Sequence, residues 1–187
     1  DITLARSQQS ILLIDGDMRK PRVHKIFQTS HRKGLSSVLV GKNTLEEAIV
    51  QTPVKGLHLL PVGPIPPNPS ELIGSKAMAQ FIAGLKKKFE FIIIDTPPVM
   101  AVTDAVALSP FVDGVMLITR AGSTPRQVVK HSLDQLRAVN ANILGVVLNG
   151  VGTGKDSYYY SQYYYSYYGE DEDKKKRHSK AKGKAHS

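Results

Sequence analysis

The 187-residue chain contains no cysteine and no tryptophan, and no apolar run in it is long enough to cross a membrane. Without cysteine, the chain can form neither disulfides nor thiolate metal sites. A transmembrane helix needs roughly eighteen consecutive apolar residues, and no stretch approaches that length. The first ten residues lack the basic start and apolar middle of a signal peptide. The six histidines show no paired spacing typical of a metal site. These absences indicate a globular domain without disulfides.

Positive charge exceeds negative charge, but the excess is spread along the chain. The formal net charge is +9. Residues 155–187 hold eight Lys or Arg against five Asp or Glu, which leaves +6 for residues 1–154. A field this mild lacks the concentrated basic stripe of a nucleic-acid-binding protein, so we expect no nucleic-acid partner.

Tyrosine is missing from the whole chain except one short segment. All eight tyrosines are Tyr158, Tyr159, Tyr160, Tyr163, Tyr164, Tyr165, Tyr167 and Tyr168. Tyrosine favours strands, so one interpretation is an aromatic, aggregation-prone segment. The cluster nevertheless lies between a glycine-rich linker and a highly charged tail, not between packing partners. This position favours a phosphorylation segment.

Five short aliphatic runs predict strands that are buried on both faces, as in a parallel sheet. They cover residues 11–14, 57–62, 91–95, 115–119 and 143–149. Apolar residues at helical spacing predict helices over 75–89 and 125–139, the second with Thr124 as N-cap and Pro125 as its first residue. Strands that alternate with helices predict an α/β fold with a mostly parallel sheet and helices on both faces.

Three acids follow two of these runs directly. Asp15 and Asp17 follow the first run, and Asp95 ends the run "FIIID". Ligands of open α/β sheets bind outside the carboxyl ends of the strands. Three carboxylates at neighbouring strand ends would suit Mg²⁺, which prefers oxygen ligands. An Asp after a strand can also be a turn or capping residue, but two such sites in one chain favour a site for a metal and a nucleotide.

Four elements, in this order, resemble the bacterial protein-tyrosine kinases known as BY-kinases. "ILLIDGDMRKP" is similar to their second Walker motif, A-prime, and "FIIIDTPPV" to their Walker B motif. "LLPVGPIPPNPSELI" at 59–73 resembles the loop between these motifs, and the tyrosine cluster resembles the family's autophosphorylation segment. The resemblance implies a P-loop NTPase-like α/β fold. It implies an enzyme that uses ATP and Mg²⁺ to phosphorylate its own C-terminal tyrosines, Tyr158 to Tyr168, in trans.

The resemblance also implies roles for individual residues. Asp15 would be the catalytic base near the tyrosine hydroxyl, while Asp17 and Asp95 would hold Mg²⁺, partly through water. Asn149 would lie near the adenine base, although a polar residue at a strand end is an equally simple interpretation. Phosphoryl transfer depends mostly on positioning and charge stabilisation, which is consistent with acids on the metal and a base beside the nucleophile.

One departure from the family concerns the Walker A loop, G-x-x-x-x-G-K-[ST], which is not found before the A-prime motif in this sequence. "GVGTGKDS" at 150–157 follows the last core strand, and we interpret it as a linker. The expected organisation is a kinase domain at 1–154 that lacks its first strand and P-loop, followed by a tyrosine cluster and a disordered charged tail at 155–187. The chain alone is therefore expected to fold poorly and to bind ATP poorly.

The family's biology implies partners and a location. It implies a ring-like homo-oligomer, a membrane polysaccharide co-polymerase or export component that is fused or separate, and a cognate tyrosine phosphatase. The process would be capsular or exopolysaccharide biosynthesis at the cytoplasmic side of the inner membrane. The basic end, 174–187, is either a solvated tail or a segment attracted to anionic lipid. Two alternatives are a partition- or septum-type ATPase, and a non-catalytic adaptor with a tyrosine tail.

Overall fold

The computed structural model of the chain describes residues 10–151. The predicted tyrosine cluster and charged tail, and the first nine residues, lie outside the described residues. Within residues 10–151, no helix is long and apolar enough to cross a membrane.

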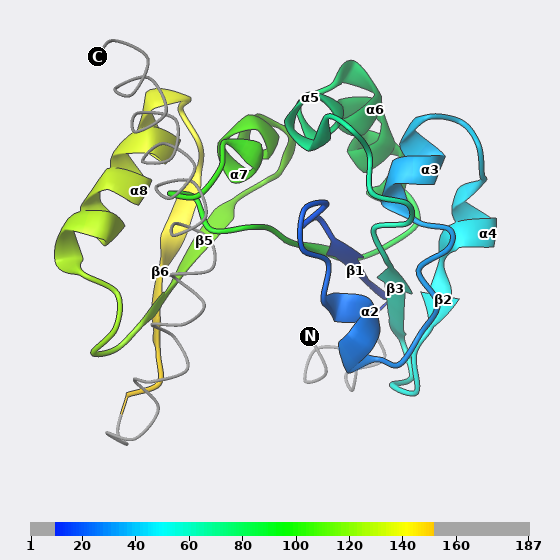
Figure 1. Cartoon of the computed structure of the whole chain (residues 1–187), viewed down its shortest axis with the longest axis horizontal. Helices are drawn as coiled ribbons and strands as arrows, with labels where there is room; N and C mark the ends of the chain where they lie inside the picture. The colour runs from blue at the N-terminus through cyan, green and yellow to red at the C-terminus, as the bar shows by residue number, and fades with distance from the viewer. Residues whose placement is uncertain (1–9, 152–187) are drawn as a thin grey trace, which may run out of the picture.

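The first sheet has the strand order β2-β3-β1-β4, and Figure 1 labels β2, β3 and β1 side by side. β1 (Ile11–Asp15) lies between β3 (Leu57–Leu60) and β4 (Phe91–Asp95), and it is parallel to both. The short strand β2 (Val50–Gln51) pairs with β3 in the antiparallel direction. β1 is thus the central strand, and its end and the end of β4 meet at one edge of the sheet.

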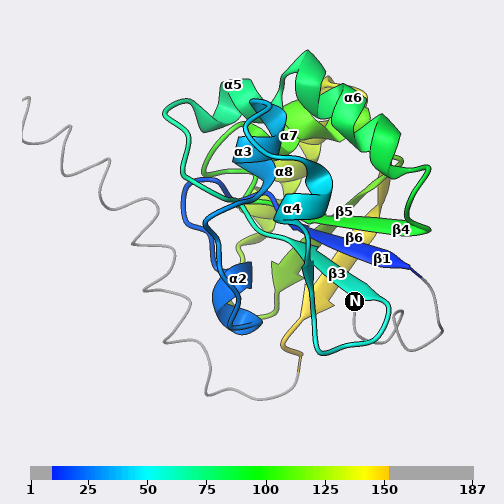
Figure 2. The same cartoon turned by 90° about the vertical axis from the view of Figure 1, so that its right-hand side faces the viewer.

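Every residue of β1 is buried, because helices cover both faces of the first sheet. Leu12 and Ile14 pack in a core with residues from helices on one face, while Ile11 and Leu13 pack with Val23 on the other. Figure 2 shows the helices of the first face above the strands and the short helix α2 below them. The first-face helices are α3 (Leu35–Leu39), α4 (Leu45–Ala48), α5 (Pro69–Ile73), α6 (Lys76–Leu85) and α7 (Asp104–Leu108), the last continued by the 3₁₀ turn η1 (Ser109–Phe111). α2 spans Val23–Ile26. The uninterrupted aliphatic run of β1 therefore reflects burial on both faces.

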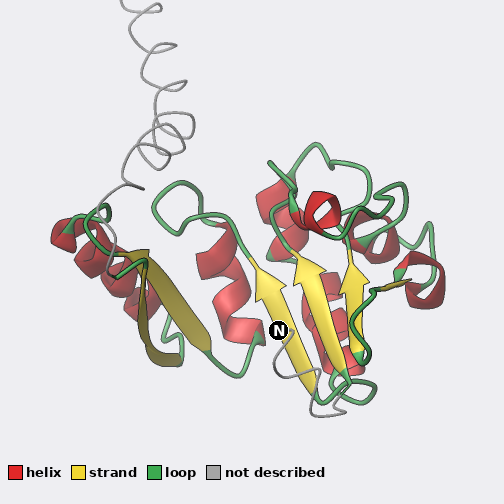
Figure 3. Cartoon of the chain, turned by 90° about the horizontal axis from the view of Figure 1, so that it is seen from below, coloured by secondary structure: helices red, strands yellow, loops and turns green. Residues whose placement is uncertain are grey.

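A second sheet consists of two parallel strands, β5 (Val115–Arg120) and β6 (Ile143–Asn149), with α8 (Arg126–Ala138) on one face (Figure 3). All five predicted strands are thus present, and the predicted α/β class is confirmed. The predicted helix over 75–89 ends earlier, at Leu85. The predicted cap of α8 is wrong: Pro125 is the N-cap, and the Thr124 hydroxyl instead accepts a hydrogen bond from the Arg120 N–H at 3.0 Å.

The two sheets do not join within the described residues. β4 pairs with β1 along one edge and β5 pairs with β6 along one edge, which leaves the other edge of each strand without a strand partner in residues 10–151. A cavity of about 610 Å³ lies between them, lined by residues such as Phe91, Ile94 and Met116. Unpaired strand edges and exposed apolar side chains beside a cavity are typical of a sheet that accepts a further strand.

Candidate active site at the ends of β1 and β4

The parallel register of β1 and β4 brings two of the predicted acids side by side. Asp15 and Asp95 are register partners at the last position of each strand. The chain then stays close to β4, because the Gly16 N–H donates to the Asp95 carbonyl oxygen at 2.8 Å. A Cβ atom at residue 16 would lie 2.6 Å from that oxygen, a distance that no side chain tolerates. Glycine at this position is therefore what allows the acidic loop to lie against the end of β4.

Asp15 is fully buried, and backbone donors hold both of its carboxylate oxygens. Its Oδ1 accepts from the Asp17 N–H at 3.3 Å, and its Oδ2 accepts from the Val23 N–H at 3.1 Å. The pKa of Asp15 is raised to about 6, mainly by burial and to a smaller extent by the negative charges of Asp95 and Asp17, while the two backbone hydrogen bonds act in the opposite direction. A carboxylate with this pKa can take up and release a proton close to neutral pH.

Asp17 and Asp95 complete a group of three neighbouring acids. Asp17 Oδ1 accepts from the backbone N–H groups of Arg19 at 3.1 Å and Lys20 at 2.9 Å, which fixes the turn after β1. Asp95 ends its strand at the exposed edge, and its pKa is raised by partial burial and by the charge of Asp17. The three carboxylates therefore lie within electrostatic reach of one another.

These carboxylates fit a hard divalent cation, because such an ion would relieve their mutual repulsion and prefers oxygen ligands. Among residues 10–151, no group of three or more His, Asp or Glu side chains is arranged so that it could hold a metal ion by itself. A cation here would consequently need ligands from water or from phosphate as well, which is the usual arrangement for Mg²⁺.

A second set of polar side chains fixes the acidic loop from the other side. Arg19 donates from Nε to Asp104 Oδ2 at 3.1 Å and from one terminal nitrogen to Asp104 Oδ1 at 3.2 Å. The same nitrogen donates to Ser70 Oγ at 2.7 Å, and Ser70 Oγ donates to Asp104 Oδ1 at 2.6 Å. Since Asp104 is 1% exposed, this is a buried carboxylate that a bidentate arginine and a hydroxyl satisfy. We name these three residues the Arg19 clamp.

The clamp was not predicted from the sequence. The structure places Arg19 on Asp104, which lies 85 positions further along the chain. Ser70 and Asp104 each stand in the first turn of a short helix, where serine and aspartate are common for capping reasons alone. The sequence held no signal that separated this pairing from ordinary capping.

The structure does not test the roles predicted for Asn149 and the tyrosines. Asn149 is the last residue of β6 in the second sheet, where its register partner is Arg120 of β5. It is exposed, and its backbone carbonyl accepts from the Ala121 N–H at 2.8 Å. Its proposed contact with adenine therefore stays a prediction. The eight tyrosines lie outside the described residues.

The chain is similar in sequence to several known proteins. Residues 2–142 match the family model described as an AAA domain. CapB of Staphylococcus aureus is 41% identical over 159 residues, which cover 85% of this chain and 70% of CapB. The tyrosine-protein kinase YwqD of Bacillus subtilis is 37% identical over 158 residues, which cover 84% of this chain and 67% of YwqD. The chain thus spans roughly two thirds of these two relatives.

Solved structures agree with these matches. The kinase domain of the Escherichia coli tyrosine kinase ETK is 34% identical with a TM-score of 0.78, and the alignment covers 83% of this chain and 61% of that one. The cell-division ATPase MinD of Pyrococcus furiosus has a TM-score of 0.67 at 24% identity, covering 82% of this chain and 65% of MinD. The likeness to MinD shows a shared fold and does not support the alternative of a septum-type ATPase.

Proposed function

This chain belongs to the bacterial tyrosine-protein kinases, and on that premise we propose that the intact protein phosphorylates its own C-terminal tyrosines. The reaction is transfer of the γ-phosphoryl group of ATP to Tyr158 through Tyr168 of a neighbouring copy. The observation that carries the proposal is the group of three carboxylates at the ends of β1 and β4, in which Asp15 has a pKa of about 6.

Asp15 is the proposed base. A tyrosine hydroxyl has an ordinary pKa near 10, so at neutral pH it must lose its proton to become an effective nucleophile. The ionised Asp15 side chain accepts that proton. Its position does not drift during the transfer, because the backbone N–H groups of Asp17 and Val23 hold one oxygen each. A pKa of about 6 leaves most of the carboxylate ionised at neutral pH while keeping it basic enough to take a proton.

Asp17 and Asp95 are the proposed ligands of Mg²⁺, directly or through water. When bound, the ion would neutralise charge on the phosphates of ATP during transfer. The turn that carries Asp17 is held by its own hydrogen bonds to Arg19 and Lys20 and by the Arg19 clamp. Asn149 is a further proposed contact, to the adenine base.

The gap between β4 and β5 is the proposed place of one further strand and its phosphate-binding loop, in a segment of the intact protein. The supporting observations are the unpaired edges of β4 and β5 within residues 10–151 and the 610 Å³ cavity between them. Hydrogen exchange tests this step. The amides of β4 and β5 should exchange far more slowly in the intact protein than in the 187-residue chain, and equal rates would refute it.

The partners and the cellular location are also part of the proposal. We propose a ring-like homo-oligomer that acts in capsular or exopolysaccharide biosynthesis at the cytoplasmic side of the inner membrane. A polysaccharide co-polymerase or export component and a tyrosine phosphatase would be its partners. Each phosphate adds roughly −1.5 to −2 charges, so phosphorylation would turn a +3 tail negative and separate the subunits.

The test is mass spectrometry of the intact protein after incubation with Mg²⁺ and ATP. Asp15→Asn should lower the rate of tyrosine phosphorylation by at least about 100-fold, the usual effect of losing a general base. Asp134→Asn is the matched control, because Asp134 is an exposed carboxylate on α8. Phosphate on the cluster at an equal rate in Asp15→Asn would refute the assigned base. No phosphate in the wild type would refute the kinase.

A further inference from the structure

The segment that follows the acidic loop carries only positive charge. Between Met18 and Leu45 the sequence has seven Lys or Arg and no Asp or Glu. Four of the basic or histidine side chains in this segment, Arg22, Lys25, His31 and Arg32, are exposed around α2. We call these four residues, together with Ile26, the basic face.

The local fold gathers this face into one patch. The Thr29 N–H donates to the His24 carbonyl oxygen at 2.9 Å, and Gln28 has a φ of 52°, so the chain turns back after α2. The rings of His24 and His31 then lie 4.3 Å apart, centre to centre. This contact holds His31 against α2, and the exposed Arg32 is the next residue in the chain.

An apolar side chain lies within this charged patch. Ile26 is 73% exposed, although α2 buries Val23 and His24. A large aliphatic side chain beside several cations matches a ligand that combines negative charge with an apolar or aromatic group. In a basic loop that binds nothing, exposing this large aliphatic side chain to water would bring no gain in stability.

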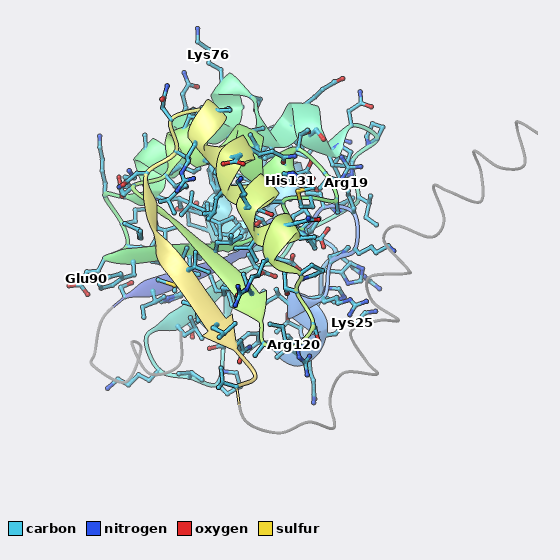
Figure 4. All side chains as sticks on the ribbon, turned by 90° about the vertical axis from the view of Figure 1, so that its left-hand side faces the viewer. Arg19, Lys25, Lys76, Glu90, Arg120 and His131 are labelled. Atoms are coloured by element: carbon cyan, nitrogen blue, oxygen red, sulfur yellow. The ribbon has the colours of Figure 1, made fainter. Side chains whose placement is uncertain are left out.

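The patch also adjoins the proposed base. The Val23 N–H at the start of α2 donates to Asp15 Oδ2 at 3.1 Å. A segment that binds the basic face therefore lies within a few residues' reach of Asp15. Figure 4 shows Arg19 and Lys25 along the same edge of the molecule, with Lys76 projecting elsewhere.

The chain contains one segment of matching chemistry. The last tyrosine, Tyr168, is followed after one glycine by the acidic run 170–173, "EDED". Two residues of extended chain span about 7 Å, and twelve span about 40 Å. If the acidic run is held at α2, every tyrosine from 158 to 168 is within reach of Asp15.

We propose that the basic face docks residues 158–173 of a neighbouring copy. The acidic run lies against Lys25 and Arg32, and a tyrosine ring of the same segment covers Ile26. Attraction between opposite charges holds the substrate segment near the site without fixing which of the tyrosines reaches Asp15. The inference rests on the proposed kinase function, because it names how that site takes up its substrate.

A two-protein assay with charge reversal tests the docking. The donor is the intact protein with its eight tyrosines replaced by Phe, and the acceptor is the intact protein inactivated by Asp15→Asn. In the donor, Lys25→Glu with Arg32→Glu should raise KM for the acceptor about tenfold with a smaller change in kcat, because surface ion pairs act mainly on encounter and binding. The matched control is a donor with Lys76→Glu and Lys87→Glu. Both lysines are exposed, Lys76 in α6 and Lys87 just after it, and their replacement should leave KM unchanged.

The decisive variant reverses the acceptor as well. Replacing residues 170–173 of the acceptor with four lysines should raise KM for the unchanged donor, and should restore a low KM for the reversed donor. Failure of this restoration overturns the proposal, as does an equal effect of the Lys76 and Lys87 control.

A binding measurement separates the docking from the chemistry. A fluorescein-labelled peptide of residues 156–173 is titrated with the tyrosine-free donor, and its anisotropy gives Kd without ATP. We expect the Lys25→Glu and Arg32→Glu donor to bind about tenfold more weakly, with the difference reduced at high salt. Binding with these features but no phosphorylation would overturn the kinase and keep the docking. Phosphorylation with no such difference in Kd or KM would keep the kinase and overturn the docking.

Discussion

Removing the arginine of the Arg19 clamp should be costly, because it would leave a buried carboxylate without its charged partner. Arg19→Ala deletes the contacts of 3.1 and 3.2 Å to Asp104 and the contact of 2.7 Å to Ser70. Only the Ser70 hydroxyl, at 2.6 Å, then remains among the described donors to Asp104 in this network. Breaking a fully buried ion pair costs about 3–5 kcal/mol of unfolding free energy.

The position of Arg19 lowers that estimate. Its side chain is 35% exposed, while Asp104 is 1% exposed, so water can replace part of the guanidinium. We therefore expect Arg19→Ala to lower the free energy of unfolding by about 2–3 kcal/mol. Arg19→Lys keeps the charge but loses the bidentate geometry, and it should cost about 1–2 kcal/mol.

The assay is urea unfolding of the intact protein followed by circular dichroism. Tyrosine and tryptophan fluorescence does not report on residues 10–151, because all eight tyrosines lie between 158 and 168 and tryptophan is absent. Arg137→Ala is the matched control. Arg137 pairs with Asp134 at 3.5 Å on the surface of α8, and its loss should cost less than about 0.5 kcal/mol. Equal costs for Arg19→Ala and Arg137→Ala would refute the view that the clamp stabilises the loop.

Two further predictions concern the acidic loop. Gly16→Ala places a Cβ 2.6 Å from the Asp95 carbonyl oxygen, so it should lower the free energy of unfolding in urea by about 2–3 kcal/mol. The control is Gly84→Ala in α6, where a Cβ meets nothing within 4 Å. This change should raise the free energy of unfolding by about 0.5–1 kcal/mol. The pKa of Asp15 is raised from 3.8 to about 6, so the folded protein holds this proton more tightly than the unfolded chain does. Its contribution to the free energy of unfolding is greatest below pH 4 and falls by about 2–3 kcal/mol as the pH rises through 6. Urea titrations across this range, without divalent cations, should show that fall in the wild type and not in Asp15→Asn.

The activity of the intact kinase should depend on pH in the opposite sense, because the proposed base must be ionised. The rate should therefore fall as the pH drops through about 6, and a cation beside the carboxylates would move that limb lower. The test is the Asp15→Glu variant, provided that it keeps residual activity. If its rate falls over the same acid pH range as in the wild type, this fall is not due to Asp15.

The sequence was informative where local chemistry decides the structure. The run "ILLID" predicts a buried strand because a strand that helices cover on both faces has no polar face, and β1 is such a strand. Acids directly after two parallel strands must meet if the strands are neighbours, and Asp15 and Asp95 are register partners. The short helices α2, α3 and α4 were not predicted, because four or five residues are too few to show a helical period.

Contacts between segments that lie far apart in the chain could not be predicted from the sequence. Arg19 and Asp104 are separated by 85 positions, and nothing near either residue indicates the other. Thr124 shows the same limit at short range. It has the residue type of an N-cap, but its hydroxyl accepts from the Arg120 N–H four residues earlier, and Pro125 takes the N-cap position. A propensity is satisfied by whichever donor the fold brings closest.

The acidic site and the Arg19 clamp together form a balance of opposing effects in one loop. Burial raises the pKa of Asp15 and costs stability at neutral pH, chiefly because the carboxylate loses its hydration and to a smaller extent because Asp95 and Asp17 repel it. The backbone donors to Asp15 and the clamp on Asp104 offset that cost without neutralising the acids. A loop under purely structural constraint would dispense with the repulsion by replacing one acid. Its presence is explained if the acids serve a cation and a proton transfer, in which case the clamp holds the loop in the geometry that the reaction needs.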